Sequence, residues 1–243
     1  PEEVQAAEAA GEAPSPLFTG GKADWVHALV AIAAPHDGST FLNVQPDAAN
    51  ALSTLFLGAA RALGISAFKG VYDFRLDQFG IRKDDNETFA QALDRVLRSD
   101  FLSHNDNAFL DLTIDKSLEI NKGIEIQPNV YYFSYAGDQT SADPLTGNHY
   151  PTVSAIPSNG MSALMMPGSI NMGKYCDKYT AGGIYIDRSW LPNDGLVNTV
   201  SALYPTTTDK NTTECLKRDG TQGWINYDGY SDITFRPGIW YVM

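Results

Sequence analysis

The sequence has 243 residues, of which 43% are hydrophobic and 19% charged, and its formal net charge at pH 7 is −12. This composition is typical of a globular protein, and the length suffices for one large α/β domain or two small ones. The negative charge argues against nucleic acid and anionic membranes as electrostatic partners, but it leaves a neutral lipid surface open. No run of about 18 apolar residues is present, so the sequence contains no candidate transmembrane segment.

The two ends of the sequence indicate a fragment of a longer protein. The sequence begins at Pro1 without an initiator methionine or a signal peptide, and it stops at Met243 directly after an apolar run. The absence of a signal peptide from a fragment therefore does not place the protein in the cytoplasm. Cys176 and Cys215 form either one disulfide or two free, buried thiols.

The first strong element along the chain is the near-continuous apolar run 25–34. Because breakers bound this run, it predicts a strand that is buried on both faces of a parallel sheet. The turn 35–40, Pro-His-Asp-Gly-Ser-Thr, follows the strand and is expected at the carboxyl edge of the sheet, where α/β proteins place their sites. His36 in this turn is either a catalytic group or a hydrogen-bonded structural residue.

Helical periodicity predicts an amphipathic helix over 47–63, with Asp47 as its N-cap and Gly64 as its C-cap. The helix is apolar nearly all round, which is typical of a core helix or of a helix that covers a surface that is sometimes uncovered. A second helix is expected over 89–97. The following segment, 103–112, contains one histidine and two aspartates, which are either metal ligands or part of an ordinary polar loop.

The aromatic-rich run 129–136 predicts a second buried strand. The segment between this strand and Asp194 is rich in Gly, Pro, Asn and Ser, and it is too long for a simple crossover loop. We therefore interpret it as an elaborated functional insertion. Because the sequence has no internal repeat and no low-complexity linker, we expect one domain over 1–243.

The segment 190–199, Trp-Leu-Pro-Asn-Asp-Gly-Leu-Val-Asn-Thr, carries the best candidate for a catalytic carboxylate. Its Asn-Asp-Gly turn lifts Asp194 out of a tight bend, and the Leu-Val pair behind it can anchor that bend in a core. A triad aspartate needs this arrangement, because it must be a fixed acceptor that holds a histidine in the right tautomer. The alternative is a surface turn with an ordinary solvated aspartate.

Seven segments, in the same order and with similar spacing, resemble the secreted bacterial lipases of the thermophilic Bacillus/Geobacillus and staphylococcal group. They are residues 15–21, 34–40, 71–80, 129–132, 145–151, 186–199 and 238–240. The resemblance implies an α/β-hydrolase fold, a mostly parallel sheet flanked by helices, with a lid helix and an insertion, incomplete in this chain. Residues 47–63 would be the lid helix, and residues 71–112 would belong to the metal-binding subdomain.

The same resemblance assigns roles to three residues. Asp194 falls on the triad aspartate, Asp106 falls on an aspartate that binds zinc, and Gly160 falls near a glycine whose carbonyl binds calcium. Both metals are implied by the resemblance alone. The nucleophile elbow Gly-x-Ser-x-Gly is absent, and all four histidines precede Asp194, whereas this fold orders its triad Ser-Asp-His. We therefore expect the chain to be inactive by itself.

The resemblance implies a secreted lipase that hydrolyses triacylglycerols at an oil-water interface by a Ser-His-Asp mechanism. In the full-length protein, this chain would supply only the triad aspartate. Two alternatives stay open: a non-catalytic α/β-hydrolase-like binding or scaffold protein, and a soluble short-chain carboxylesterase. The acyl-chain preference and the oligomeric state do not follow from the sequence.

Overall fold

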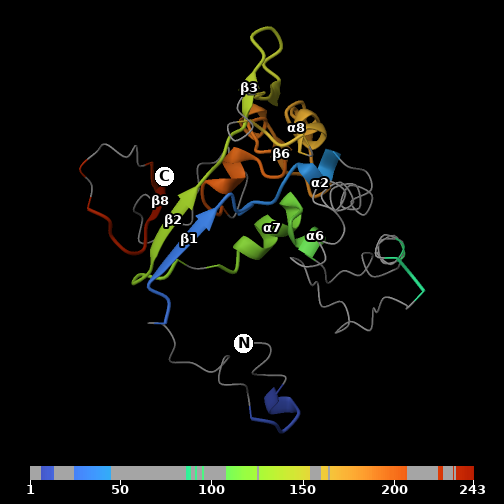
Figure 1. Ribbon diagram of the computed structural model, residues 1–243. Coiled ribbons are helices and arrows are strands. Elements are labelled where there is room, and N and C mark those ends of the chain that lie inside the picture. The colour runs from blue at the N-terminus through green and yellow to red at the C-terminus, as the bar shows by residue number, and fades with distance from the viewer. Residues whose placement is uncertain are drawn as a thin grey trace.

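The computed structural model describes residues 7–13, 25–44, 86–88, 91, 95, 108–124, 126–153, 160–163, 165–206, 224–226, 232 and 234–243. Within them lies a four-stranded sheet of order β1-β2-β8-β7. Its strands are β1 (Ala28–Ile32), β2 (Tyr131–Tyr135), β7 (Trp224–Asn226) and β8 (Trp240–Val242). Each pairing is parallel, so the carboxyl ends of the strands share one edge, and β1 and β2 point there toward α2, α8 and β6 (Figure 1).

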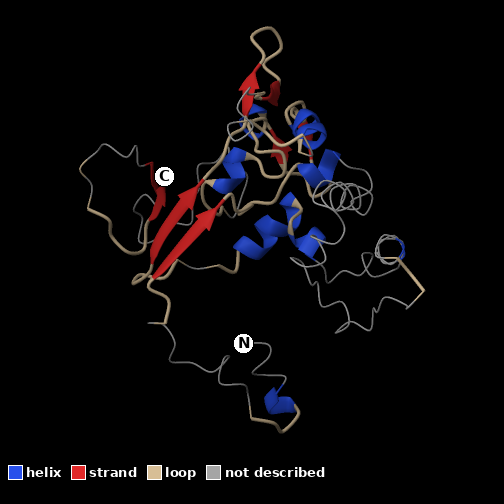
Figure 2. Cartoon of the chain, viewed as in Figure 1, coloured by secondary structure: helices blue, strands red, loops and turns tan. Residues whose placement is uncertain are grey.

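Short helices and two small antiparallel hairpins surround this edge. The helices are α2 (Phe41–Val44), α6 (Ala108–Asp111), α7 (Ile114–Asn121), α8 (Met166–Met172), and the 3-10 turns η4 (Arg188–Trp190) and η5 (Thr199–Ala202). The hairpins pair β3 (Thr140–Ala142) with β4 (His149–Pro151), and β5 (Lys178–Tyr179) with β6 (Tyr185–Ile186). In Figure 2 the helices α6 and α7 lie beside β1, whereas α2 and α8 lie beyond its carboxyl end.

Two apolar clusters form the core of the described residues. The first packs against the sheet and contains Ala31, Val130, Tyr132, Tyr204, Trp240 and Val242. The second joins α7 to β6 and η4 through Ile114, Leu118, Ile186 and Trp190. The segment that contains Asp194 runs from the second cluster, at Trp190, to the first, at Tyr204, and is therefore anchored at both ends.

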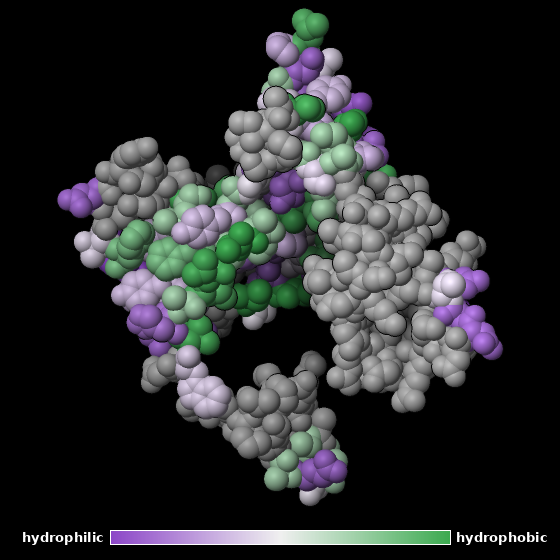
Figure 3. All heavy atoms as spheres, in the orientation of Figure 1, coloured by the Kyte–Doolittle hydropathy of each residue, from purple (hydrophilic) through white to green (hydrophobic). Residues whose placement is uncertain are grey.

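The predicted first strand exists, but the prediction that both of its faces are buried is wrong. Ala31 is 8% exposed, whereas its neighbours Val30 and Ile32 are 55% and 75% exposed. Successive side chains of a strand point to opposite faces, so Ala31 reaches the first cluster while Val30 and Ile32 lie on the other face. Among the described residues β1 is an edge strand and little covers this outer face, which forms an apolar area in Figure 3.

The second predicted strand and the predicted turn after the first strand are both present. The strand predicted over 129–136 is confirmed as β2, and the turn 35–38 follows β1 as expected, with the Gly38 amide donating to the Pro35 carbonyl at 3.0 Å. The helix predicted over 47–63 lies outside the described residues, as does most of the predicted metal-binding subdomain, 71–112. No helix in the described part of the chain is long and apolar enough to cross a membrane.

Candidate functional site

Asp194 lies in a tight loop closed by its own backbone. Asn193 and Asn198 face each other in an antiparallel bridge, and the Asp194 amide donates to the Val197 carbonyl at 3.1 Å. Gly195 occupies the left-handed region with φ +101°, and a Cβ there would lie 2.6 Å from the Cβ of Met165. A residue with a side chain would therefore be strained and would also collide with its neighbour, so the Asn-Asp-Gly sequence fits this bend.

The loop holds one oxygen of the Asp194 carboxylate. Oδ1 accepts hydrogen bonds from the amides of Leu196 at 2.9 Å and Val197 at 2.8 Å. The side chain is half-buried, and no described residue donates a hydrogen bond to its other oxygen, Oδ2. A carboxylate held in this way is a fixed acceptor with one oxygen left for a further donor, which is what the sequence predicts for a triad aspartate.

The loop is attached to the carboxyl edge of the sheet just beyond β2. The Gln139 amide donates to the Asn193 carbonyl at 3.0 Å, and the Thr199 hydroxyl donates to the Gly137 carbonyl at 2.8 Å. A Cβ on Gly137 would lie 3.8 Å from the Cβ of Asp194. Asp194 thus lies at the sheet edge where α/β proteins place their sites.

The turn after β1 grips the same loop from another side. The Ser39 hydroxyl donates to the Leu196 carbonyl at 2.5 Å. The Thr40 amide and hydroxyl lie 2.8 Å and 3.0 Å from Oδ1 of Asn198. Sequence reasoning placed this turn at the edge but gave these side chains no role, because the contacts join residues about 160 positions apart in the sequence.

An aromatic side chain anchors the start of the segment. Trp190 is 1% exposed. Burying a tryptophan removes roughly 150–250 Å² from water, which contributes about 4–6 kcal/mol at about 25 cal/mol per Å². One hydrogen bond contributes about 1 kcal/mol. Apolar burial of Trp190 therefore anchors the start of the segment, whereas the polar contacts set the place of its loop.

Asp37 and His36 are bound into the sheet edge. Asp37 is fully buried, and its Oδ1 accepts from the Asn121 side chain at 3.0 Å and from the Thr206 amide at 2.8 Å. The His36 ring meets the Trp240 ring edge-on, with 5.0 Å between centroids, and its Nε2 lies 3.4 Å from the Ser134 hydroxyl. These contacts favour the structural interpretation of His36.

The two predicted metal ligands are assigned to different metals, Asp106 to zinc and Gly160 to calcium, and Asp106 lies outside the described residues. Gly160 lies near the Asp194 loop, because the adjacent Met161 is buried and its Sδ lies 3.3 Å from where a Cβ on Gly195 would be. However, the described residues contain no group of three or more His, Cys, Asp or Glu able to hold a metal. Calcium takes about 6–8 oxygen ligands, and Gly160 offers one carbonyl.

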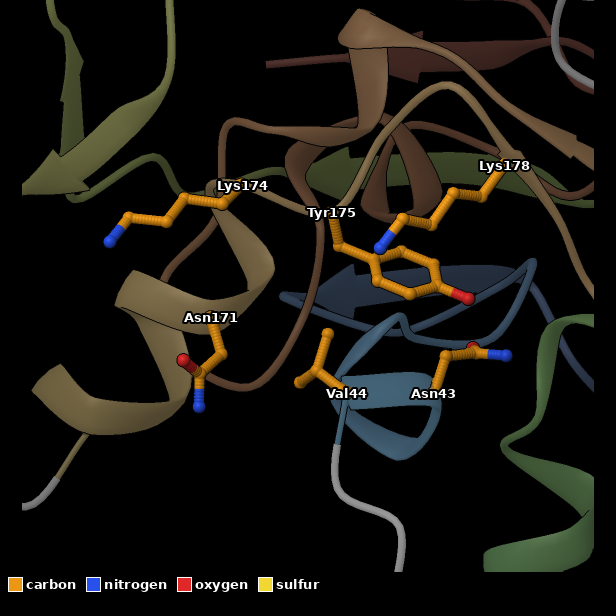
Figure 4. A pocket seen from close by; sticks show the side chains of 6 residues that line it. All are labelled: Asn43, Val44, Asn171, Lys174, Tyr175 and Lys178. Carbon is orange, nitrogen blue, oxygen red and sulfur yellow. The ribbon is translucent and has the colours of Figure 1, made fainter.

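A cavity of about 390 Å³, which Asp194 does not line, lies between α2, α8 and the chain that follows α8 (Figure 4). It is lined by Asn43, Val44, Asn171, Lys174, Tyr175 and Lys178. The Lys178 ammonium lies 4.8 Å from the centroid of the Tyr175 ring, and burial, with a further contribution from the charge of Asp115, raises the pKa of Tyr175. None of the residues that line this cavity is a predicted site residue.

The fold and the loop define an α/β protein that presents a fixed carboxylate at the carboxyl edge of a parallel sheet. Residues 1–226 match the family described as "Lipase-like, C-terminal domain". The chain belongs to this family, which confirms the lipase resemblance seen in the sequence.

Individual relatives agree with this assignment. Over 99% of the present chain, the sequence is 28% identical to lipase 2 of Staphylococcus aureus. Over 94% of the present chain, it is 29% identical to the lipase of Staphylococcus hyicus. It spans 30% of the length of each.

Solved structures resemble it as well. EstA from Clostridium botulinum matches 95% of the chain with a TM-score of 0.74 and 30% identity, and the chain covers 49% of EstA. The Staphylococcus hyicus lipase structure matches 99% of the chain with a TM-score of 0.67 and 25% identity, and the chain covers 53% of it.

Proposed function

We propose that the full-length protein is a secreted carboxylic ester hydrolase of α/β-hydrolase fold that acts on triacylglycerols and similar water-insoluble esters. The observation that carries the proposal is the Asp194 carboxylate, held through Oδ1 by two backbone amides at the carboxyl edge of the sheet. Membership in the lipase-like family supports the reaction class. The whole activity is a proposal, because the chain spans 30% of the length of the curated lipases that it matches.

In the proposed mechanism Asp194 acts on a histidine and not on the substrate. A serine hydroxyl attacks the ester carbonyl, the histidine takes the serine proton and passes it to the leaving alcohol, and water then releases the acyl group by the same route. Oδ2 of Asp194 would accept a hydrogen bond from the ring nitrogen that does not take the serine proton, fix the tautomer of the imidazole and stabilise the imidazolium. The serine and this histidine would come from sequence outside the present chain, since all four of its histidines precede Asp194.

The remaining features predicted from the family resemblance belong to the same proposal. Residues 47–63 would be a lid that opens at an oil-water interface, where burial of its apolar face, at about 25 cal/mol per Å², would offset the cost of opening. Residues 71–112 would carry the zinc ligand Asp106, and Gly160 would donate its carbonyl to calcium. The mechanism above uses neither metal.

The decisive substitution is Asp194→Asn in the full-length gene product. Asparagine keeps an Oδ1 that can accept from the amides of Leu196 and Val197, so the loop should persist. It lacks the negative charge that stabilises the imidazolium. We expect kcat for p-nitrophenyl ester hydrolysis to fall roughly 10⁴-fold with the thermal unfolding midpoint nearly unchanged. Activity within a few-fold of wild type would refute the triad assignment.

Asp143 provides a matched control. Its Oδ1 also accepts from the amides two and three residues ahead, Leu145 at 3.1 Å and Thr146 at 2.7 Å, but it lies in the exposed β3–β4 hairpin. Asp143→Asn should leave kcat unchanged.

Comparing a long-chain with a short-chain p-nitrophenyl ester separates the lipase from its alternatives: hydrolysis of short chains alone indicates a soluble esterase, and a folded protein without activity indicates a scaffold.

A further inference from the structure

Asn198 makes a complete set of side-chain hydrogen bonds in the interior. It is 0% exposed. Its Nδ2 donates to the Trp190 carbonyl at 2.5 Å and to the Thr40 hydroxyl at 2.8 Å, and its Oδ1 accepts from the Thr40 amide at 2.8 Å. An amide side chain has two donors and one acceptor oxygen, so this environment satisfies all of them and specifies asparagine.

The partners of Asn198 come from two different elements. Thr40, also fully buried, ends the turn after β1 and leads into α2. Trp190 ends η4 and belongs to the second apolar cluster. The Asn198 amide group therefore bonds both elements at the same time. Because all of its hydrogen-bonding groups are engaged, the Asn198 side chain holds the turn after β1 at a fixed distance from the start of the Asp194 segment.

This side chain is also one step away from the candidate carboxylate. Asn198 bridges Asn193, and Asp194 lies in the loop that the bridge closes. The Ser39 hydroxyl adds a second contact from the same turn, to the Leu196 carbonyl. The loop can therefore move relative to the sheet edge only if the contacts of Ser39, Thr40 and Asn198 are broken.

We infer that Thr40 and Asn198 are positioning residues that set the place of the Asp194 carboxylate relative to the sheet edge, and hence to the histidine it would orient. This inference rests on the proposed function. Neither side chain contacts Asp194, so both act through the loop. A displacement of about 1 Å at a reacting group costs roughly 100-fold in rate, so a small shift of this loop should be visible in turnover.

The test replaces Thr40 by valine in the full-length gene product. Valine has the shape of threonine and keeps the hydrogen bond from its backbone amide to Asn198 Oδ1. It removes the hydroxyl that accepts from Asn198 Nδ2. We expect kcat to fall about 10- to 100-fold with KM unchanged, measured well below the unfolding temperature. Thr40→Ser restores a hydroxyl at the same position and should recover most of kcat. If the valine variant does not fold, Thr40→Cys, whose sulfur is a weak acceptor for Asn198 Nδ2, should show a smaller fall in kcat in the same direction.

Thr206→Val is the matched structural control. Thr206 is 1% exposed, and its hydroxyl bonds the buried Asp37 at 2.5 Å and not a residue of the Asp194 loop. It should lower the unfolding midpoint without changing kcat. If Thr40→Val or Thr40→Cys likewise lowers only the midpoint, while Asp194→Asn is inactive, the positioning role is refuted and the proposed function stands. If Asp194→Asn stays active, the proposed function fails, and the inference fails with it.

Discussion

Gly38→Ala should destabilise the protein more than a positive φ alone explains. Gly38 has φ +79°, and a Cβ there would lie 2.7 Å from the backbone of Thr113 and Ile114 at the start of α7. The left-handed conformation costs a residue with a side chain about 1–2 kcal/mol. Overpacking against backbone that cannot rotate away adds about 1–3 kcal/mol. We therefore expect Gly38→Ala to lower the free energy of unfolding by about 2–5 kcal/mol.

Gly183 separates these two contributions. It has φ +87°, but a Cβ there would meet no atom within 4 Å, so Gly183→Ala should cost only the conformational part, about 1–2 kcal/mol. Urea unfolding followed by tryptophan fluorescence measures both variants. With a slope of about 2–3 kcal/mol per M, the midpoint of Gly38→Ala should fall by roughly 0.7–2.5 M, and that of Gly183→Ala by roughly 0.3–1 M.

Equal midpoints for the two alanine variants would refute this reasoning. The turn after β1 would then adjust without cost, and the backbone at the start of α7 would not act as a rigid support for it. The contacts of Ser39 and Thr40 with the Asp194 loop would lose their fixed base as well.

Two further predictions concern a thiol and the metals. Cys176 is a free thiol, and burial, followed by its hydrogen bond to Asp177, raises its pKa, so less thiolate forms at a given pH. Its alkylation by iodoacetamide should reach half of its maximal rate at a higher pH than that of an exposed cysteine, and Asp177→Asn should shift this midpoint downward; an unshifted midpoint would contradict the cause. Elemental analysis of the full-length protein should find zinc that Asp106→Ala removes and calcium that a chelator removes, and a wild-type protein without zinc would end the Asp106 assignment.

Local patterns in the sequence predict the elements that local physics decides. The apolar run 25–34 and the aromatic run 129–136 become β1 and β2 because each is long enough and bounded by breakers. The Asn-Asp-Gly turn predicts the Asp194 loop because only such residues adopt that bend cheaply. Burial of β1 is predicted wrongly, since it depends on which neighbours lie beside the strand, and periodicity carries no information about them.

The residues that support the candidate site depend, like the burial of β1, on contacts between distant parts of the sequence. Thr40 and Asn198 look like ordinary turn residues in the sequence, and only the fold brings them together as a buried pair. Helices α7 and α8 were not predicted either, because they are short and packing outweighs their weak helical periodicity. The sequence thus predicts the candidate carboxylate, whereas the residues that hold it in place become visible only in three dimensions.

The parallel sheet also has a consequence for how fast the protein folds. Its register pairs Ala28 with Tyr131 and Tyr132 with Trp240, so each pairing closes a loop of roughly a hundred residues before any contact repays the lost chain entropy. Topologies dominated by such distant contacts fold in milliseconds to seconds or more slowly. Until β1 pairs with β2, its apolar residues Leu29, Val30 and Ile32 lie on a strand that has no neighbour. We expect the yield of native protein to be set by the competition between strand pairing within one chain and association between chains, and therefore to fall as the concentration during refolding rises.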